Sequence, residues 1–148
     1  MKLTVEAHIM PAMLATAREA APLEACGLLG GRNEHATEFY RLTNADASGE
    51  HYSMLPEEQF AAAKDMRAKD IKMLAIWHSH PATPARMSDE DLRLAYTPDV
   101  VYLILSLAKP DNPDLRGFVV KEGWPVEVEV ALTPDTEHLP PDHGDGPT

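Results

Sequence analysis

The most informative stretch of the chain is residues 78–91, which read His78-Ser79-His80-Pro81-Ala82-Thr83-Pro84-Ala85-Arg86-Met87-Ser88-Asp89-Glu90-Asp91. A compact apolar run, Met73 to Trp77, leads directly into it and predicts a buried strand that ends in the two histidines. Residues two apart on a strand project to the same face. His78 and His80 therefore form a pair that can bind a borderline-soft cation such as zinc.

The segment that follows predicts a third ligand. Two prolines stiffen the loop from Pro81 to Met87, and Ser88 followed by acidic residues is typical of the start of a helix. This helix would bring Asp91 back toward the histidines. Two neutral histidines and one carboxylate leave zinc an open tetrahedral position for water, as in catalytic sites, where the metal lowers the pKa of that water to about 7.

The rest of the chain alternates between strand-like and helix-like segments. We expect strands over 2–9, 26–31, 39–43, 51–55, 73–77, 100–107, 115–120 and 126–132, and helices over 12–21, 56–69 and 88–96. The second helix is predicted from Phe60, Ala63 and Met66 at helical spacing. This alternation predicts an α/β class with a mixed sheet. We expect one domain over 1–132 and a disordered, acidic, Pro-rich tail over 133–148.

Composition excludes several classes of partner. The net charge of -11 and the absence of a basic patch argue against nucleic acid and anionic membranes. The single cysteine, Cys26, rules out an internal disulfide and suits a reducing compartment. We see no secretory signal at the N-terminus and no apolar run of the roughly 20 residues that span a bilayer. The expected location is the cytoplasm.

The motif of residues 78–91 resembles that of the JAMM (MPN+, Mov34-type) metallopeptidase family. The resemblance rests on His-x-His, the following proline, and Ser88-x-x-Asp91 at this spacing. The family motif also contains a glutamate far upstream, after the first helix. Glu24, in Pro22-Leu23-Glu24-Ala25-Cys26-Gly27-Leu28-Leu29-Gly30, stands where bacterial members carry it, and the resemblance extends from about Leu3 to Leu132.

The resemblance implies a fold and a reaction. The fold would be a single MPN domain, a curved mixed sheet flanked by helices and similar to the cytidine-deaminase architecture. One zinc per chain would be held by His78, His80 and Asp91. Glu24 would take a proton from the attacking water and deliver it to the leaving amine, and Ser88 would donate a hydrogen bond to the developing oxyanion.

The resemblance also implies a class of substrate. Close bacterial look-alikes process ubiquitin-like sulfur-carrier proteins by cutting the bond after a C-terminal Gly-Gly. The chain lacks the long inserts of eukaryotic deubiquitinating relatives, so we do not expect polyubiquitin as a substrate. An extended carrier tail would lie along a strand edge near the site, in a channel too narrow for side chains.

Other functions are compatible with parts of the pattern. A non-catalytic MPN-type scaffold would hold a partner without chemistry, but such relatives usually lack motif residues that are all present here. A zinc hydrolase acting on a small amide or nucleobase is disfavoured, because deaminases use Cys-x-x-Cys and this chain has one cysteine. Non-catalytic relatives need not contain zinc, so metal content separates the first alternative from an enzyme.

Individual residues also have plainer interpretations. His78 and His80 could be ordinary strand-end histidines, and Ser88 could serve only as a helix cap. Cys26 is expected to be a small buried hydrophobe, the alternative being a thiolate that closes the fourth zinc position. Four further histidines follow no ligand spacing and are expected to be solvent-exposed: His35, His51, His138 and His143.

Overall fold

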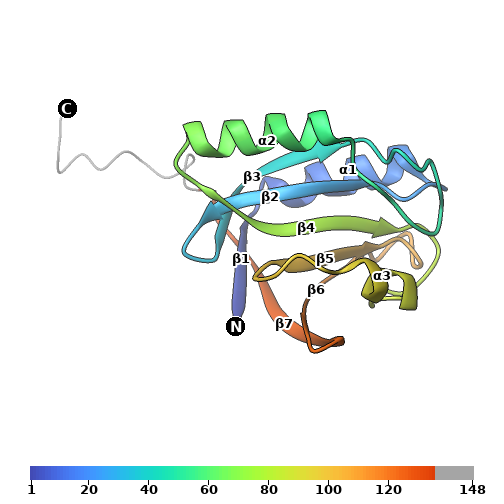
Figure 1. Ribbon diagram of the computed structural model, residues 1–148. Coiled ribbons are helices and arrows are strands. Elements are labelled where there is room, and N and C mark those ends of the chain that lie inside the picture. The colour runs from blue at the N-terminus through green and yellow to red at the C-terminus, as the bar shows by residue number, and fades with distance from the viewer. Residues whose placement is uncertain (136–148) are drawn as a thin grey trace.

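The structure is a computed structural model that describes residues 1–135 (Figure 1). Its elements follow the order β1 (Lys2–Glu6), α1 (Ile9–Ala20), β2 (Cys26–Arg32), β3 (His35–Leu42), α2 (Pro56–Ala68), β4 (Lys72–His80), α3 (Asp89–Leu94), β5 (Val101–Ser106), β6 (Asp114–Lys121) and β7 (Trp124–Thr133). The predicted α/β class is confirmed, and all three predicted helices are present.

The strands form one mixed sheet that closes into a barrel in the order β1-β3-β2-β4-β5-β6-β7. Three pairs are parallel, namely β1 with β3, β1 with β7, and β4 with β5, while the other pairs are antiparallel. The first strand closes the barrel because it pairs on both sides, with Leu3 opposite Val130 of the last strand. A closed sheet satisfies strand edges that an open one would leave exposed.

The helices cover the two sides of this sheet. Helix α1 buries Ile9, Met13 and Ala17 against a core that contains Trp77 of β4 and Leu103 of β5. Helix α2 lies over the opposite side (Figure 1). There it packs the buried side chains of Ala62 and Met66 on β2 and β3. Both apolar faces of β4 are therefore covered, which fixes the strand that carries the two histidines.

Helix α2 orients its residues differently from the expected pattern. Phe60, which helped to predict the helix, is 73% exposed, and Ala63 is exposed as well. The stripe of Phe60, Ala63 and Met66 lines a groove, and Ala62 takes the place of Ala63 in the core. The apolar spacing identified the helix, but part of that stripe faces a surface depression.

The strand expected over 51–55 is absent. Only an isolated bridge between Asn44 and Met54 remains. The Asn44 side chain explains this, because its amide donates to the carbonyls of Ser48 and His51 and its oxygen accepts from the Ser53 amide. A side chain that satisfies several backbone groups of one loop competes with regular pairing.

The end of the described chain lies against its beginning. Strand β7 extends through Thr133, and the Asp135 carboxylate accepts a hydrogen bond from the His8 amide at 2.8 Å. Of the tail expected over 133–148, residues 136–148 lie outside the described residues. Within residues 1–135, none of the helices combines the length and apolar character needed to cross a membrane.

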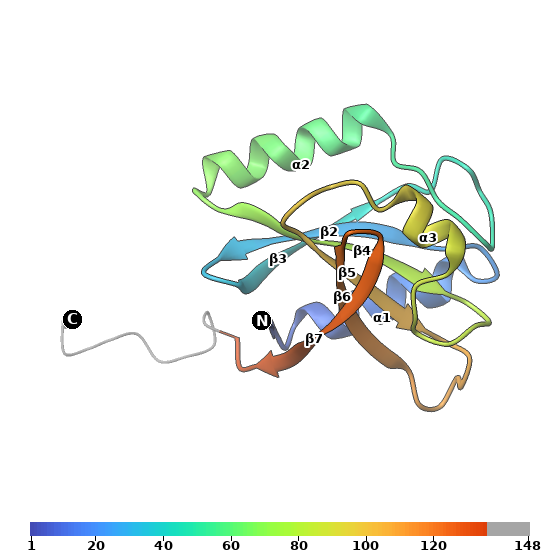
Figure 2. The ribbon, with the colours of Figure 1, turned by 60° about the horizontal axis from the view of Figure 1, so that its bottom comes forward.

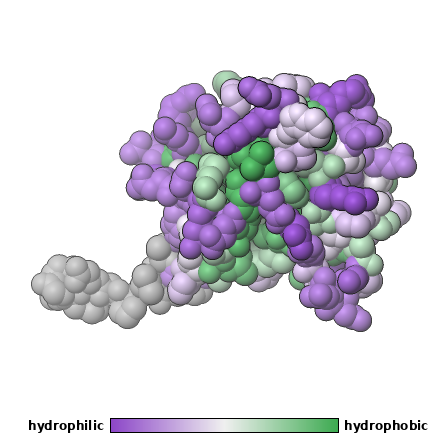
Figure 3. Space-filling view, turned by 90° about the horizontal axis from the view of Figure 1, so that it is seen from below, coloured by the Kyte–Doolittle hydropathy of each residue, from purple (hydrophilic) through white to green (hydrophobic). Residues whose placement is uncertain are grey.

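Within residues 1–135, the face formed around β6 and β7 carries no helix of its own. Figure 2 shows this hairpin at the front of the molecule, and the face seen from below is hydrophilic at its rim and hydrophobic toward its middle (Figure 3). Strand β7 carries the exposed side chains of Trp124, Val126 and Leu132. The barrel wall is thus directly exposed to solvent on this side.

Candidate metal centre

His78 and His80 lie close together at the C-terminal end of strand β4. Both residues are buried, and their Nε2 atoms lie 3.1 Å apart. The strand is held on both sides there, because His78 is opposite Cys26 of β2 and Ile104 of β5. The ladder therefore sets the separation of the two imidazoles, as the two-residue period predicts.

Helix α3 brings Asp91 to the same point. Its Oδ1 lies 3.2 Å from Nε2 of His78, and its Oδ2 lies 3.0 Å from Nε2 of His80. A capping box orients this carboxylate, since Ser88 N donates to Asp91 Oδ2 and Asp91 N donates to Ser88 Oγ, both at 3.0 Å. The structure thus brings together all three residues that the sequence suggested as ligands.

The hydrogen bonds of His80 indicate whether His78, His80 and Asp91 together can bind a cation. Its Nδ1 lies 2.8 Å from the carbonyl oxygen of Pro84, which can only accept, so Nδ1 carries the proton. In the neutral ring, Nε2 then presents a lone pair toward His78 and the Asp91 carboxylate. Acceptor atoms 3.0–3.2 Å apart repel unless a proton or a metal ion lies between them. Tetrahedral zinc places its nitrogen ligands about 3.3 Å apart, so these residues fit it.

The pKa values of these residues follow from burial and from the Asp91 charge. Burial lowers the pKa of His78. Burial also acts to lower the pKa of His80, but hydrogen bonds to Asp91 and Pro84 outweigh it and raise the value. Burial opposes the charge of Asp91 in turn, yet the hydrogen bonds from both histidines hold the pKa of this carboxyl far below its usual range. Asp91 is therefore a permanent anion in the cluster.

Glu24 reaches the same cluster from the segment before β2. Ser79, between the two histidines, is fully buried, and its Oγ accepts from the Ala25 amide at 2.8 Å while its own amide donates to the Ala25 carbonyl at 3.0 Å. The Glu24 amide donates to the Ser48 carbonyl, and its carbonyl accepts from Asn44 Nδ2 at 3.0 Å. Its side chain offers an oxygen within 4.8 Å of the ligand nitrogens of both histidines.

The Glu24 carboxylate differs from that of Asp91 in having an unsatisfied oxygen. Among the described residues, its Oε1 is buried and has no hydrogen-bond partner. Burial raises the pKa of Glu24 to about 8, although the charge on His80 opposes the shift. Asp91 is held by several partners, whereas Glu24 keeps a free acceptor atom. A carboxylate with a free, buried oxygen and a raised pKa can both accept and release a proton near neutrality.

Cys26 packs as a small hydrophobe. Although it lies opposite His78 in the ladder, its thiol is directed at the Leu42 carbonyl at 3.8 Å and packs among apolar residues under α2. Burial raises the pKa of Cys26 to about 12, with Glu58 and Glu24 adding to the effect. The thiol is thus protonated at neutral pH, and its contacts favour the expected buried hydrophobe over a thiolate ligand.

Sequence reasoning missed three residues that shape the site. Ser79 was treated only as the spacer of His-x-His, Asn44 was not singled out, and Tyr52 was only part of an expected strand. The Tyr52 ring stacks on the His78 ring, with centroids 4.8 Å apart and planes inclined by 28°. The alternation of β4 predicts that Ser79 faces away from the histidines. No local pattern predicts the contacts of Asn44 and Tyr52, which depend on an irregular loop.

The chain is similar to several known proteins. The model of a family described as prokaryotic homologs of the JAB domain matches residues 6–119. The CysO-cysteine peptidase of Mycobacterium tuberculosis is 34% identical over 130 residues, 86% of this chain and 89% of that protein. A solution structure from Desulfitobacterium hafniense has a TM-score of 0.84 at 48% identity, covering 93% of this chain and 97% of that one. A JAB1/MPN domain protein from Archaeoglobus fulgidus shares the fold, with a TM-score of 0.58 at 23% identity over 87% and 99% of the two chains.

We predict that Asp91→Ala lowers zinc retention. Removing one of the three expected ligands, together with its hydrogen bond in the capping box of α3, should weaken zinc binding at least tenfold. Metal content after dialysis against a graded series of chelator concentrations measures this. Asp89→Ala is the matched control, because Asp89 is exposed in the same first turn of α3. Equal zinc retention by both variants would remove Asp91 from the ligand set.

Proposed function

The chain belongs to the family of prokaryotic homologs of the JAB domain, and from that premise we propose that it is a zinc-dependent peptidase of the JAMM type. Its substrate is a ubiquitin-like sulfur-carrier protein, cut after the C-terminal Gly-Gly. The observation that carries the proposal is the convergence of His78, His80 and Asp91 beside the unpartnered Glu24 oxygen. The 34% identical CysO-cysteine peptidase, covered over 89% of its length, supports the substrate class.

The first role of these residues is to hold one zinc ion per chain. The Nε2 atoms of His78 and His80 and an oxygen of Asp91 are the proposed ligands. Zinc, when bound, lowers the pKa of water and polarises the substrate carbonyl. The Nδ1 hydrogen bond of His80 to Pro84 fixes its tautomer, and the Tyr52 ring holds the plane of His78. Such outer contacts keep ligands oriented for the metal.

Glu24 is the proposed general base and acid. Its free Oε1 accepts the proton of the attacking water, and the same atom later delivers a proton to the departing amine. Two backbone hydrogen bonds of Glu24 and the Ala25–Ser79 contacts position it beside the histidines. The proton therefore moves without rearrangement of the main chain.

Ser88 is the proposed oxyanion donor. Its Oγ accepts from the Asp91 amide at 3.0 Å, which occupies one lone pair and leaves the hydroxyl proton available. The capping role and the catalytic role therefore use different parts of one hydroxyl group. A hydrogen bond to the developing oxyanion stabilises the transition state more than the ground state.

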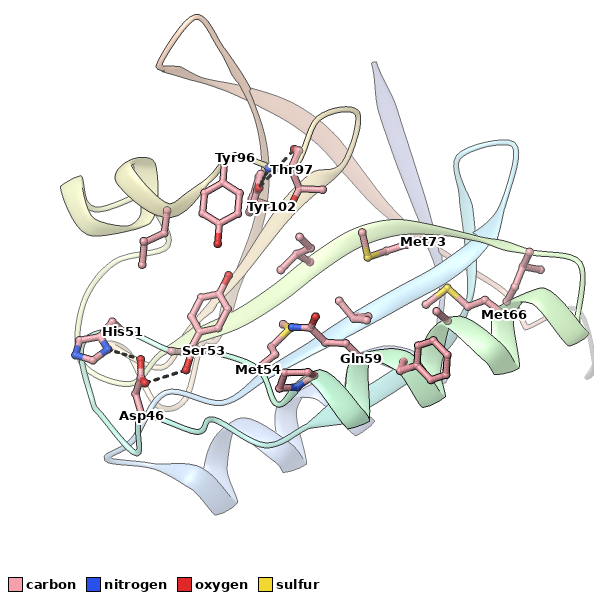
Figure 4. A pocket seen from close by; sticks show the side chains of 18 of the residues that line it. Asp46, His51, Ser53, Met54, Gln59, Met66, Met73, Tyr96, Thr97 and Tyr102 are labelled. Carbon is pink, nitrogen blue, oxygen red and sulfur yellow. Dashed lines mark hydrogen bonds and ion pairs between the residues drawn. The ribbon is translucent and has the colours of Figure 1, made fainter.

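A groove of about 1170 Å³ is the proposed binding place for the carrier tail. In Figure 4, Gln59 and Met66 of α2 lie on one side, Tyr96 and Thr97 on the other, and Met73 of β4 lies between them. The lining also contains Met54, Phe60 and Ile76. These apolar walls suit the hydrophobic side chains of an extended peptide.

The tail was expected to lie along a strand edge near the site, and β4 does not supply such an edge. Residues 75–80 of β4 pair with β5, and residues 72–78 pair with β2, so no edge of β4 is free beside the histidines. The groove therefore recognises a tail mainly through side-chain contacts. Between the groove and His78 lies a second cavity of only about 10 Å³, bordered by Tyr52 and Tyr102. This space accommodates about one water molecule, so it leaves no room for a side chain.

The remaining features agree with a carrier-processing enzyme. The net charge of -11 disfavours nucleic acid as a partner, and we place the protein in the cytoplasm. The non-catalytic scaffold is the alternative. It is disfavoured because the residues proposed as ligands, base and oxyanion donor are all present, and Asp91 and Glu24 lie close to both histidines. The experiments below separate the two functions.

We predict that wild-type protein loaded with zinc cleaves a ubiquitin-fold sulfur carrier bearing a short extension after Gly-Gly. Intact mass should fall to the value that ends at the second glycine. Glu24→Gln should retain zinc and lose at least a hundredfold in rate, because the amide cannot accept the proton. Glu50→Gln, an exposed neighbour in the adjoining loop, should remain active.

Two results would decide against this assignment. Full activity of Glu24→Gln would exclude Glu24 as the base. A zinc-loaded wild type that leaves the carrier intact but binds it would favour the scaffold.

We predict that Phe60→Glu weakens carrier binding through the groove. An anionic side chain on this wall of an acidic protein should raise KM about tenfold or more and leave kcat nearly unchanged. Steady-state kinetics on the same carrier measure both constants. Lys64→Gln is the matched control, since it changes the net charge by the same amount and Lys64 is exposed on α2 without lining the groove. If both variants raise KM equally, net charge rather than the groove is responsible.

A further inference from the structure

A second cluster of potential metal ligands lies away from the histidines of β4. It joins the end of β1, the start of α1 and the chain just beyond β7, and contains Glu6, His8 and Asp135. Each offers one ligand atom, and the three atoms lie within 4.8 Å of one another. None of these residues takes part in the proposed peptidase reaction.

The distances in this cluster match the coordination sphere of a small divalent ion. His8 Nδ1 lies 2.8 Å from Asp135 Oδ1 and 3.7 Å from Glu6 Oε1. Ligand atoms of tetrahedral zinc lie about 3.3 Å apart, a value between these two. A metal ion would take the place of the proton that now links His8 and Asp135. Only a few tenths of an ångström of adjustment are then needed.

A supporting layer fixes the most deeply buried of the three groups. Glu6 is 1% exposed, and its other oxygen, Oε2, lies 3.0 Å from His35 Nε2. His35 Nδ1 in turn lies 2.7 Å from the Thr4 hydroxyl on the neighbouring strand. His35 was expected to be solvent-exposed, but this relay leaves its side chain only 30% exposed. Hydrogen bonds that orient a ligating carboxylate are a regular feature of protein metal sites.

The cluster also combines the two kinds of ligand that a transition-metal ion accepts. Glu6 and Asp135 each supply a carboxylate oxygen, and His8 supplies an imidazole nitrogen. The negative charges of the two carboxylates attract a dication.

We propose that Glu6, His8 and Asp135 form a second metal site, which binds a divalent transition-metal ion such as zinc and fastens the C-terminal end of the barrel to its beginning. The ion would link residues from β1, α1 and the segment after β7. Its role is structural, and it does not depend on the proposed peptidase function. Histidine and carboxylate ligands suit zinc and its neighbours better than calcium or magnesium.

The test is a zinc titration of the full-length chain after removal of all metal. Wild type should bind two equivalents, and His8→Ala should bind one, with cleavage activity unchanged. His8 is the residue to substitute, because its side chain is 39% exposed and its loss should leave the fold intact. His51→Ala is the matched control, since His51 also pairs with an aspartate on the surface, at 2.9 Å, and should keep two equivalents.

A second measurement separates zinc binding at this site from zinc binding at His78, His80 and Asp91. In an Asp91→Ala background, added zinc should raise Tm in a concentration-dependent way, and the further change His8→Ala should abolish that rise. Equal zinc binding by wild type and His8→Ala, or a zinc-dependent rise in Tm that persists after His8→Ala in the Asp91→Ala background, would overturn the proposal. Loss of the second equivalent in His138→Ala/His143→Ala but not in His8→Ala would do the same, because the ion would then belong to the tail histidines.

Discussion

The site depends on one short piece of backbone pairing, the contact between Ser79 and Ala25. Strand β4 can present His78 and His80 on one face only by turning the residue between them to the other face. That residue is a serine, and its hydroxyl and amide bind the two backbone groups of Ala25. Glu24 precedes Ala25, so the same pairing that spaces the histidines also brings in the proposed base. The positions of the two histidines and of Glu24 are therefore coupled through the buried side chain of Ser79.

The second support of the site is the beginning of α3. Asp91 is both the third residue of a capping box and the carboxylate nearest to the histidines. A helix of six residues is too short to be stable alone. Its position relies on the cap and on packing of neighbouring residues such as Met87 and Leu92 against the barrel. The start of α3 and the arrangement of the candidate metal centre thus both depend on the Asp91 carboxylate.

Much of this arrangement could be predicted from the sequence, because it follows short-range rules. The apolar run before His78 predicted β4, and Ser88 with its acidic neighbours predicted α3. The convergence of His78, His80 and Asp91 followed from these two elements. Barrel closure could not be predicted, since the pairing of β1 with β7 joins distant segments and leaves no local pattern. The loop around Asn44 was missed for a related reason. Hydrogen bonds from the Asn44 side chain hold its backbone in place of strand pairing, and they leave no periodic pattern in the sequence. Glu24 was placed only through a family resemblance, and its contacts come from three separate segments.

The pairing of the first and last strands also constrains how the molecule folds during synthesis. Strand β1 precedes the other strands of the barrel and shares only a short parallel register with β3, Thr4 and Val5 opposite His35 and Ala36. Its longer register is with β7, from Lys2 opposite Glu129 to Glu6 opposite Thr133. The barrel therefore cannot close until β7 has been synthesised. Such non-local pairing slows folding and leaves the edges of β1 open in the nascent chain. Closure of the barrel is thus a late step in folding.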